Sequence, residues 1–260
     1  MLSKRTGVMV LVGVTLVVII AAILAPRIAQ PLSYHNFADR RAWLGIPNFG
    51  DVASNAGFAI AGIWGLVVLH GKPSRAQFVD SRERWPYVIV FAGMVLTAIG
   101  SAYYHLAPDN ARLMWDRLPM TIVFMALIAA MIMERIGVPI GLALLPILLL
   151  LGIASVVQWH ISELNGASDL RFYAALQAYA VLLLLVILLL PPRYTRSSDL
   201  LVIVGFYVLA KITETADRQI FAFGHIVSGH TIKHLAAAAA GLWILWMLQK
   251  RRPVELPEFA

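Results

Sequence analysis

Hydrophobic residues run through the chain in long segments that short polar connections separate. Eight such segments are visible, at residues 7–25, 51–70, 86–105, 118–133, 139–158, 172–190, 200–221 and 226–248. Each approaches the ~20 residues that an α-helix needs to cross ~30 Å of hydrocarbon. The strands of a membrane barrel would instead alternate polar and apolar residues. The pattern therefore predicts an all-α, polytopic membrane helix bundle.

The first segment joins a basic start to a long apolar run, in "MLSKRTGVMVLVGVTLVVIIAAILAP". A secretory signal has the same order, but its apolar core is usually about 7–15 residues long. The run at residues 7–25 is longer, which favours a retained span over a cleaved signal. We therefore divide the chain into an N-terminal transmembrane helix or signal anchor, residues 1–26, and a seven-span domain, residues 27–260.

Composition agrees with a membrane protein, because 60% of the residues are hydrophobic and only 13% are charged. Soluble domains carry about 25% charged residues. The net charge is +7. We attribute this excess to basic cytoplasmic connections and expect no nucleic-acid partner. The chain has no cysteine, so a tightly bound metal must use imidazole, carboxylate, carbonyl or water ligands.

Basic residues indicate the orientation. If the N-terminus is cytoplasmic, twelve lie inside and seven outside. The inside set is Lys4, Arg5, Lys72, Arg75, Arg82, Arg84, Arg135, Arg193, Arg196, Lys250, Arg251 and Arg252. The outside set is Arg27, Arg40, Arg41, Arg112, Arg117, Arg171 and Arg218. The positive-inside rule favours this orientation. We expect a multi-pass protein of a bacterial inner membrane, with its polar site on the periplasmic side.

Three histidines fall at one expected membrane depth. His230 and His234, in "SGHTIKHLAAAAAG", are four residues apart and share a helical face, and His105 ends the third segment at the same depth. Ionisable groups inside a membrane are costly and are usually paired. Three such ligands suit a zinc ion that keeps one open position. The alternative is that the two histidines of the last segment only pack.

Asp116 and Ser101 fall in the same layer. A carboxylate near a zinc-bound water could move its proton, and a hydroxyl could donate to a developing oxyanion. Each also has a simpler interpretation: Asp116 as a helix N-cap, and Ser101 bonded to its own backbone. We interpret the remaining histidines, His35, His70, His160 and His225, as interfacial.

Together, "GSAYYH", the aspartate of "WDRLPM" and "HTIKH" resemble the alkaline ceramidase family, within the CREST group of seven-span membrane hydrolases. The resemblance covers about residues 34–248, and the first span would be an addition. "SN" at Ser54–Asn55 points to the same branch.

The resemblance implies a zinc-dependent amidase that hydrolyses the N-acyl bond of ceramide or a related membrane lipid. His105, His230 and His234 would be zinc ligands, Asp116 would hold or deprotonate the zinc water, and Ser101 would assist at the oxyanion. Lys233 stands where animal ceramidases tend to have an aromatic residue.

Two further roles follow from the resemblance. Asp217 and Glu214 would bind a polar head group, unless they pair with Arg218 or Lys211. Asp39, Asn48 and Asp51 occupy the region that binds calcium in animal members. They make Ca²⁺ a candidate second ion, although no glutamate is present and calcium needs six to eight oxygens.

Two other classes of function remain open. A receptor-like or sensor membrane protein could keep the zinc for structure alone, and it would need neither Asp116 nor Ser101. A haem-binding electron carrier would need histidines on opposite faces of the macrocycle, which the pair His230 and His234 on one helix suits poorly.

Overall fold

The computed structural model describes residues 2–71 and 77–254, and these residues form helices without any β-strand. Lys72 and Arg75, two of the residues used for orientation, lie outside the described residues. The long helices are α1 (Lys4–Leu24), α3 (Ala56–His70), α4 (Arg84–Leu106), α5 (Asn110–Arg135), α6 (Val138–Leu164), α7 (Arg171–Ile187), α8 (Asp199–Thr215) and α10 (Gly229–Lys250). The short helices are α2 (Phe49–Ala53), α9 (Asp217–Ala222), η1 (Leu32–His35) and η2 (Ser81–Glu83).

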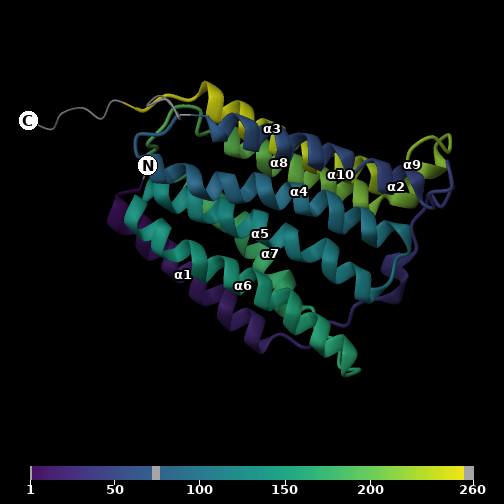
Figure 1. The fold of residues 1–260 in the computed structure, drawn as a ribbon. Helices are drawn as coiled ribbons and strands as arrows, with labels where there is room; N and C mark the ends of the chain where they lie inside the picture. Colours follow the sequence, from purple (N-terminus) through teal and green to yellow (C-terminus); the bar gives the residue numbers. More distant parts are fainter. Residues whose placement is uncertain (1, 72–76, 255–260) are drawn as a thin grey trace, which may run out of the picture.

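The long helices run up and down beside one another, so that connections gather at two ends (Figure 1). The histidine end is where α4 finishes at Leu106 and α10 begins at Gly229. The opposite end, which we call the Arg251 end, is where α4 begins at Arg84 and α10 finishes at Lys250. This alternation is what consecutive membrane spans require.

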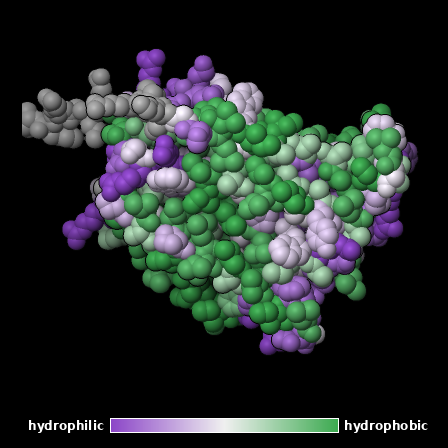
Figure 2. All heavy atoms as spheres, viewed as in Figure 1, coloured by the Kyte–Doolittle hydropathy of each residue, from purple (hydrophilic) through white to green (hydrophobic). Residues whose placement is uncertain are grey.

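Length and composition confirm a polytopic membrane bundle. Six helical elements of the described chain are long and apolar enough to cross a membrane: α1, α2 with α3, η2 with α4, α5, α6 and α10. Helix α7 is apolar but has 17 residues, and α8 also has 17. Hydrophobic side chains cover most of the middle of the visible surface, and hydrophilic ones gather toward its two ends (Figure 2).

Helix α5 is the most buried of the candidate spans and α1 the least buried. In the most apolar window of α5, 72% of the residues are buried, against 17% for α1. Helices α3, α4, α5, α7, α8 and α10 form a ring of neighbours, while α6 packs on α5 and α7, and α1 packs on α7. The hydroxyls of Thr15 and Tyr179, 2.8 Å apart, join α1 to α7.

Two expected boundaries were wrong. The segment at residues 200–221 is not one helix, because α8 ends at Thr215 and α9 begins at Asp217. The break lets the Asp217 carboxylate accept hydrogen bonds from the backbone N–H groups of Ala38 and His230. Helix α5 begins at Asn110 with Asp109 as its cap, so Asp116 lies well inside the helix and is not an N-cap.

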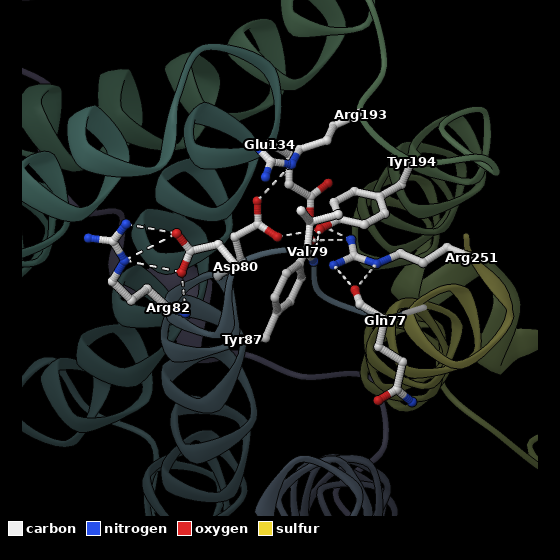
Figure 3. A network of polar contacts seen from close by, with 10 residues as sticks. Gln77, Val79, Asp80, Arg82, Tyr87, Glu134, Arg193, Tyr194 and Arg251 are labelled. Atoms are coloured by element: carbon white, nitrogen blue, oxygen red, sulfur yellow. Dashed lines mark hydrogen bonds and ion pairs between the residues drawn. The ribbon is translucent and has the colours of Figure 1, made fainter. Parts of the chain in front are cut away.

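The Arg251 end is closed by a buried polar network (Figure 3). The guanidinium of Arg251 pairs with Glu134 and donates to the carbonyl of Gln77, at 2.8 and 3.0 Å. Tyr87 Oη donates to Glu134 Oε1 at 2.7 Å. Arg251 is only 2% exposed, so the network ties the end of α10 to α4 and α5. A buried charge is tolerated when it is paired and hydrogen-bonded in this way.

Candidate metal centre

His105, His230 and His234 come together at the histidine end of the bundle. His105 lies in the last turn of α4, and the other two lie in the first turns of α10. Each side chain is nearly fully buried. One nitrogen from each ring lies within 4.8 Å of the others, which makes this the one set of histidine and acidic side chains in residues 2–71 and 77–254 placed to hold a metal ion.

The three imidazole rings form a nearly regular triangle. Their centroids are 4.8, 4.9 and 4.8 Å apart. The Nε2 atoms of His105 and His230 face each other at 3.2 Å. Two nitrogens bound tetrahedrally to one zinc, each about 2.0–2.1 Å from it, lie about 3.3 Å apart. The arrangement therefore fits a shared ion of that size.

Ser54 occupies one ring nitrogen of His234. The Ser54 hydroxyl oxygen lies 2.8 Å from Nδ1 of His234 and 3.1 Å from the carbonyl oxygen of Asp51. A hydroxyl that donates to this carbonyl accepts from an Nδ1–H group, and that tautomer has a free lone pair on Nε2, the form a metal ligand requires.

Phe37 and Asn48 hold the remaining histidines from the side of the connecting segment. The Phe37 ring lies 4.7 Å from the His105 ring and 4.5 Å from the His230 ring, between centroids. Asn48 donates to the backbone carbonyl of His105 at 2.8 Å. Among the described residues, Nδ1 of His105 is buried without a hydrogen-bond partner. A metal on Nε2 would leave this atom unpaired, so His105 lacks the outer partner that His234 has in Ser54.

The start of α10 is fixed by two aspartates. Asp51 accepts from the hydroxyls of Ser228 and Thr231 at 3.1 and 2.8 Å, while Ser228 caps the helix. Asp217 accepts from the backbone of His230 at 2.8 Å. Because negative charge is favourable at a helix N-terminus, both carboxylates stabilise the turn that carries the histidines.

Asp116 and Ser101 lie together beside the histidines but outside the cluster. Ser101 is buried in α4 and Asp116 is buried in α5, and these two helices pack against each other. No oxygen of Asp116 belongs to the group of ligand atoms within 4.8 Å of one another. Asp116 instead lines a cavity of about 210 Å³ between α5, α7, α8 and α10.

An ion-paired carboxylate stands in this cavity. Glu214 pairs with Lys211 at 2.8 Å and also with Lys233. Tyr34 donates its hydroxyl hydrogen to Glu214 at 3.3 Å, and burial raises the pKa of Tyr34 above its usual value, which keeps that hydrogen in place. Two residues were expected at a head-group site. Glu214 lines the cavity, and the two lysines balance its charge. Asp217 instead accepts hydrogen bonds from backbone N–H groups.

The three residues considered for calcium have protein partners. Arg41 donates to both oxygens of Asp39, and these side-chain hydrogen bonds hold the pKa of Asp39 below its usual value. Asn48 contacts the backbone of His105. One oxygen of Asp51, Oδ2, is buried and has no hydrogen-bond partner in the part of the chain that the structure describes. Through these contacts, the segment that carries the three residues helps to hold the histidine end together.

Comparison with known proteins identifies the class. The family model described as dsRNA-gated channel SID-1 matches residues 4–221, which is most of the chain. A search of curated proteins found no match. The protein therefore belongs to the family of the dsRNA-gated channel SID-1.

This membership corrects three expectations. The assignment to the alkaline ceramidase family was wrong, because the matching family is that of a channel. The resemblance also implied a hydrolase activity and a lipid substrate, and these expectations are wrong for the same reason. The exclusion of a nucleic-acid partner was also wrong for the family, since the matched description names double-stranded RNA. A similar set of polar residues on a similar bundle does not fix the chemistry.

Sequence reasoning missed Phe37, and it missed the role of Ser54 in supporting the histidines. Ser54 and Phe37 touch the rings, yet both lie more than forty positions from His105 in the chain. Their contacts arise only when the segment before α3 folds across the ends of α4 and α10. No periodicity reveals such a crossing.

Proposed function

We propose that the protein is a receptor-like membrane protein of this family in which His105, His230 and His234 hold a structural zinc ion. The observation that carries the proposal is the buried triangle of imidazoles with two Nε2 atoms facing at 3.2 Å. Three uncompensated imidazoles at membrane depth are costly, whereas one shared cation uses their lone pairs.

The donor set favours zinc. Neutral imidazole suits zinc, copper, iron and nickel, while calcium and magnesium prefer oxygen. Three nitrogen ligands with water or a side-chain oxygen in the fourth position give the tetrahedral arrangement that zinc adopts. The contact of the Ser54 hydroxyl with Nδ1 of His234 supplies the outer hydrogen-bond partner that metal-bound histidines usually have.

A structural role follows from what the ion would join. His105 and His230 are 125 residues apart in the chain and belong to different helices of the ring. An ion bound to both would hold the ends of α4 and α10 together beside the polar cavity. Because the ion binds the folded state, its binding free energy would add to stability.

The proposal is tested by metal analysis of the purified full chain in detergent. We expect about one zinc per chain in the wild type and in His70→Ala, which changes an exposed histidine at the far end of α3. His105→Ala, His230→Ala and His234→Ala should each lose zinc. A chelator should lower the melting temperature of the wild type but not of His234→Ala. Full zinc retention in all three variants would show that these histidines do not bind zinc.

A second candidate function is binding of duplex RNA at the histidine end, favoured by the family match. Arg40, Arg41 and Arg218 are exposed there, on the segment before α2 and on α9. Arginines of this kind can contact phosphates. Vesicles containing the protein should bind duplex RNA at ~50 mM salt and release it near 200 mM. Arg40→Gln with Arg218→Gln should weaken binding, and unchanged binding would exclude this surface.

A further inference from the structure

An unfilled groove runs along the outside of the bundle between α1 and α6. Helix α1 packs on α7 but makes few contacts with α6, so the space between them has α7 as its floor. It measures about 410 Å³, and its lining is almost wholly apolar. Cavities that bind small ligands measure about 300–1,000 Å³. In a membrane, such a groove is open to hydrocarbon chains.

The groove continues into a polar mouth at the histidine end. This second cavity, of about 480 Å³, shares Ala154 and Gln158 with the first. Its rim carries Arg27, Arg171 and Asp169. Two positive groups and one negative group leave a net charge of +1.

The charged side chains at the rim differ in whether they are ion-paired. Arg171 pairs with Asp169 at 2.8 Å and donates to the carbonyl of Ala25 at 2.6 Å, and this pairing depresses the pKa of Asp169. Arg27 is exposed, and its charge adds to that effect on Asp169. A phosphate diester with one negative charge would balance the rim.

Gln158 marks the junction of the two cavities. Its Oε1 atom is buried and has no hydrogen-bond partner within residues 2–71 and 77–254. The assignment of oxygen and nitrogen in a side-chain amide follows from its hydrogen bonds. Rotation of the amide would place Nε2 there, where it could donate to an ester carbonyl. A polar side chain at the junction of an apolar groove and a charged mouth matches the glycerol ester level of a phospholipid.

We propose that this groove is a specific binding site for one anionic phospholipid, with an acyl chain between α1 and α6, the ester group at Gln158 and the phosphate at Arg27. The site lies on the outer surface of α6 and α7, away from the histidine cluster. The lipid would complete the packing of α1, which is otherwise the least buried helix among the candidate spans.

The test is native mass spectrometry of the full chain, released from detergent with phosphatidylglycerol or phosphatidylcholine added. The wild type should retain one phosphatidylglycerol in preference to phosphatidylcholine. Arg27→Gln should reduce that preference about fivefold, the contribution typical of one basic side chain near anionic lipid. Arg218→Gln, an exposed arginine at the same end on α9, should not.

The second part of the experiment uses substitutions that fill the groove. Ala154 is exposed and lines both cavities, so Ala154→Leu should abolish retention of either lipid. Ala178→Leu places the same side chain at an exposed position of α7 outside the groove and should retain lipid. Equal retention of both lipids by the wild type, or unchanged retention in Arg27→Gln and Ala154→Leu, would overturn the proposal. So would equal losses in the control variants.

Discussion

The Nδ1 atom of His234 lies 2.8 Å from the hydroxyl oxygen of Ser54, and this contact directs the other nitrogen of the ring into the histidine cluster. The two residues lie 180 positions apart in the chain. The Ser54 hydroxyl also lies 3.1 Å from the carbonyl oxygen of Asp51, to which it can donate its hydrogen. A single hydroxyl therefore orients the ring of a proposed ligand.

We predict that Ser54→Ala keeps all three histidines but weakens zinc binding about 10–100-fold, the usual effect of removing a partner of a metal ligand. Competition with a chelator of known affinity measures this change. Thr97→Ala is the matched control, because its buried hydroxyl bonds only to Gly93 within α4. Equal affinity in the Ser54 variant and the wild type would show that packing alone orients the ring.

Asp116→Asn and Ser101→Ala should both retain a full equivalent of zinc, because neither side chain belongs to the cluster of ligand atoms. Metal analysis beside His105→Ala, which should lose zinc, gives the comparison. Loss of zinc from Asp116→Asn would instead mean that this carboxylate reaches the ion.

Gly229→Ala should destabilise the protein and weaken zinc binding. A Cβ at this position would lie 2.1 Å from the carbonyl oxygen of Thr213, so α10 would have to move away from α8. Overpacking of this kind typically costs about 1–3 kcal/mol, and the shift would carry His230 with it. Thermal melts and zinc titrations measure both effects. Gly205→Ala meets no atom within 4 Å and should be tolerated.

Glu134→Gln should be strongly destabilising, because it leaves the buried Arg251 without its counter-charge (Figure 3). Breaking one side of a buried ion pair costs about 3–5 kcal/mol. Arg82→Gln breaks an exposed pair with Asp80 and should cost about 0–1 kcal/mol. Melting temperatures in one detergent provide the comparison, and similar losses in both variants would contradict the role given to the network.

Topology reporters test the orientation expected from the basic residues. A phosphatase fused after Asn110, at the histidine end, should be active outside the cytoplasm. A fluorescent protein fused after Gly137, at the Arg251 end, should fold in the cytoplasm. Fluorescence of the fusion after Asn110 would reverse the orientation and place the histidine cluster on the cytoplasmic side.

The membrane class and most of the spans could be predicted from the sequence, because the length of an apolar run reflects the thickness of the bilayer. The proximity of His230 and His234 could also be predicted, since residues four apart share one face of a helix. The depth of His105 followed from counting spans. The first two of these properties depend on neighbouring residues alone.

Only the tertiary structure decided how the polar side chains are shared among neighbours. By sequence, Asp116 could be a helix cap or a carboxylate that moves a proton beside the zinc, and the helix start at Asn110 excludes the cap. Glu214 could face a ligand or a lysine, and the fold places Lys233 from another helix beside it. Such pairings depend on which helices touch. Contacts between segments that are distant in the chain are set by the packing of the whole bundle, which no short pattern encodes.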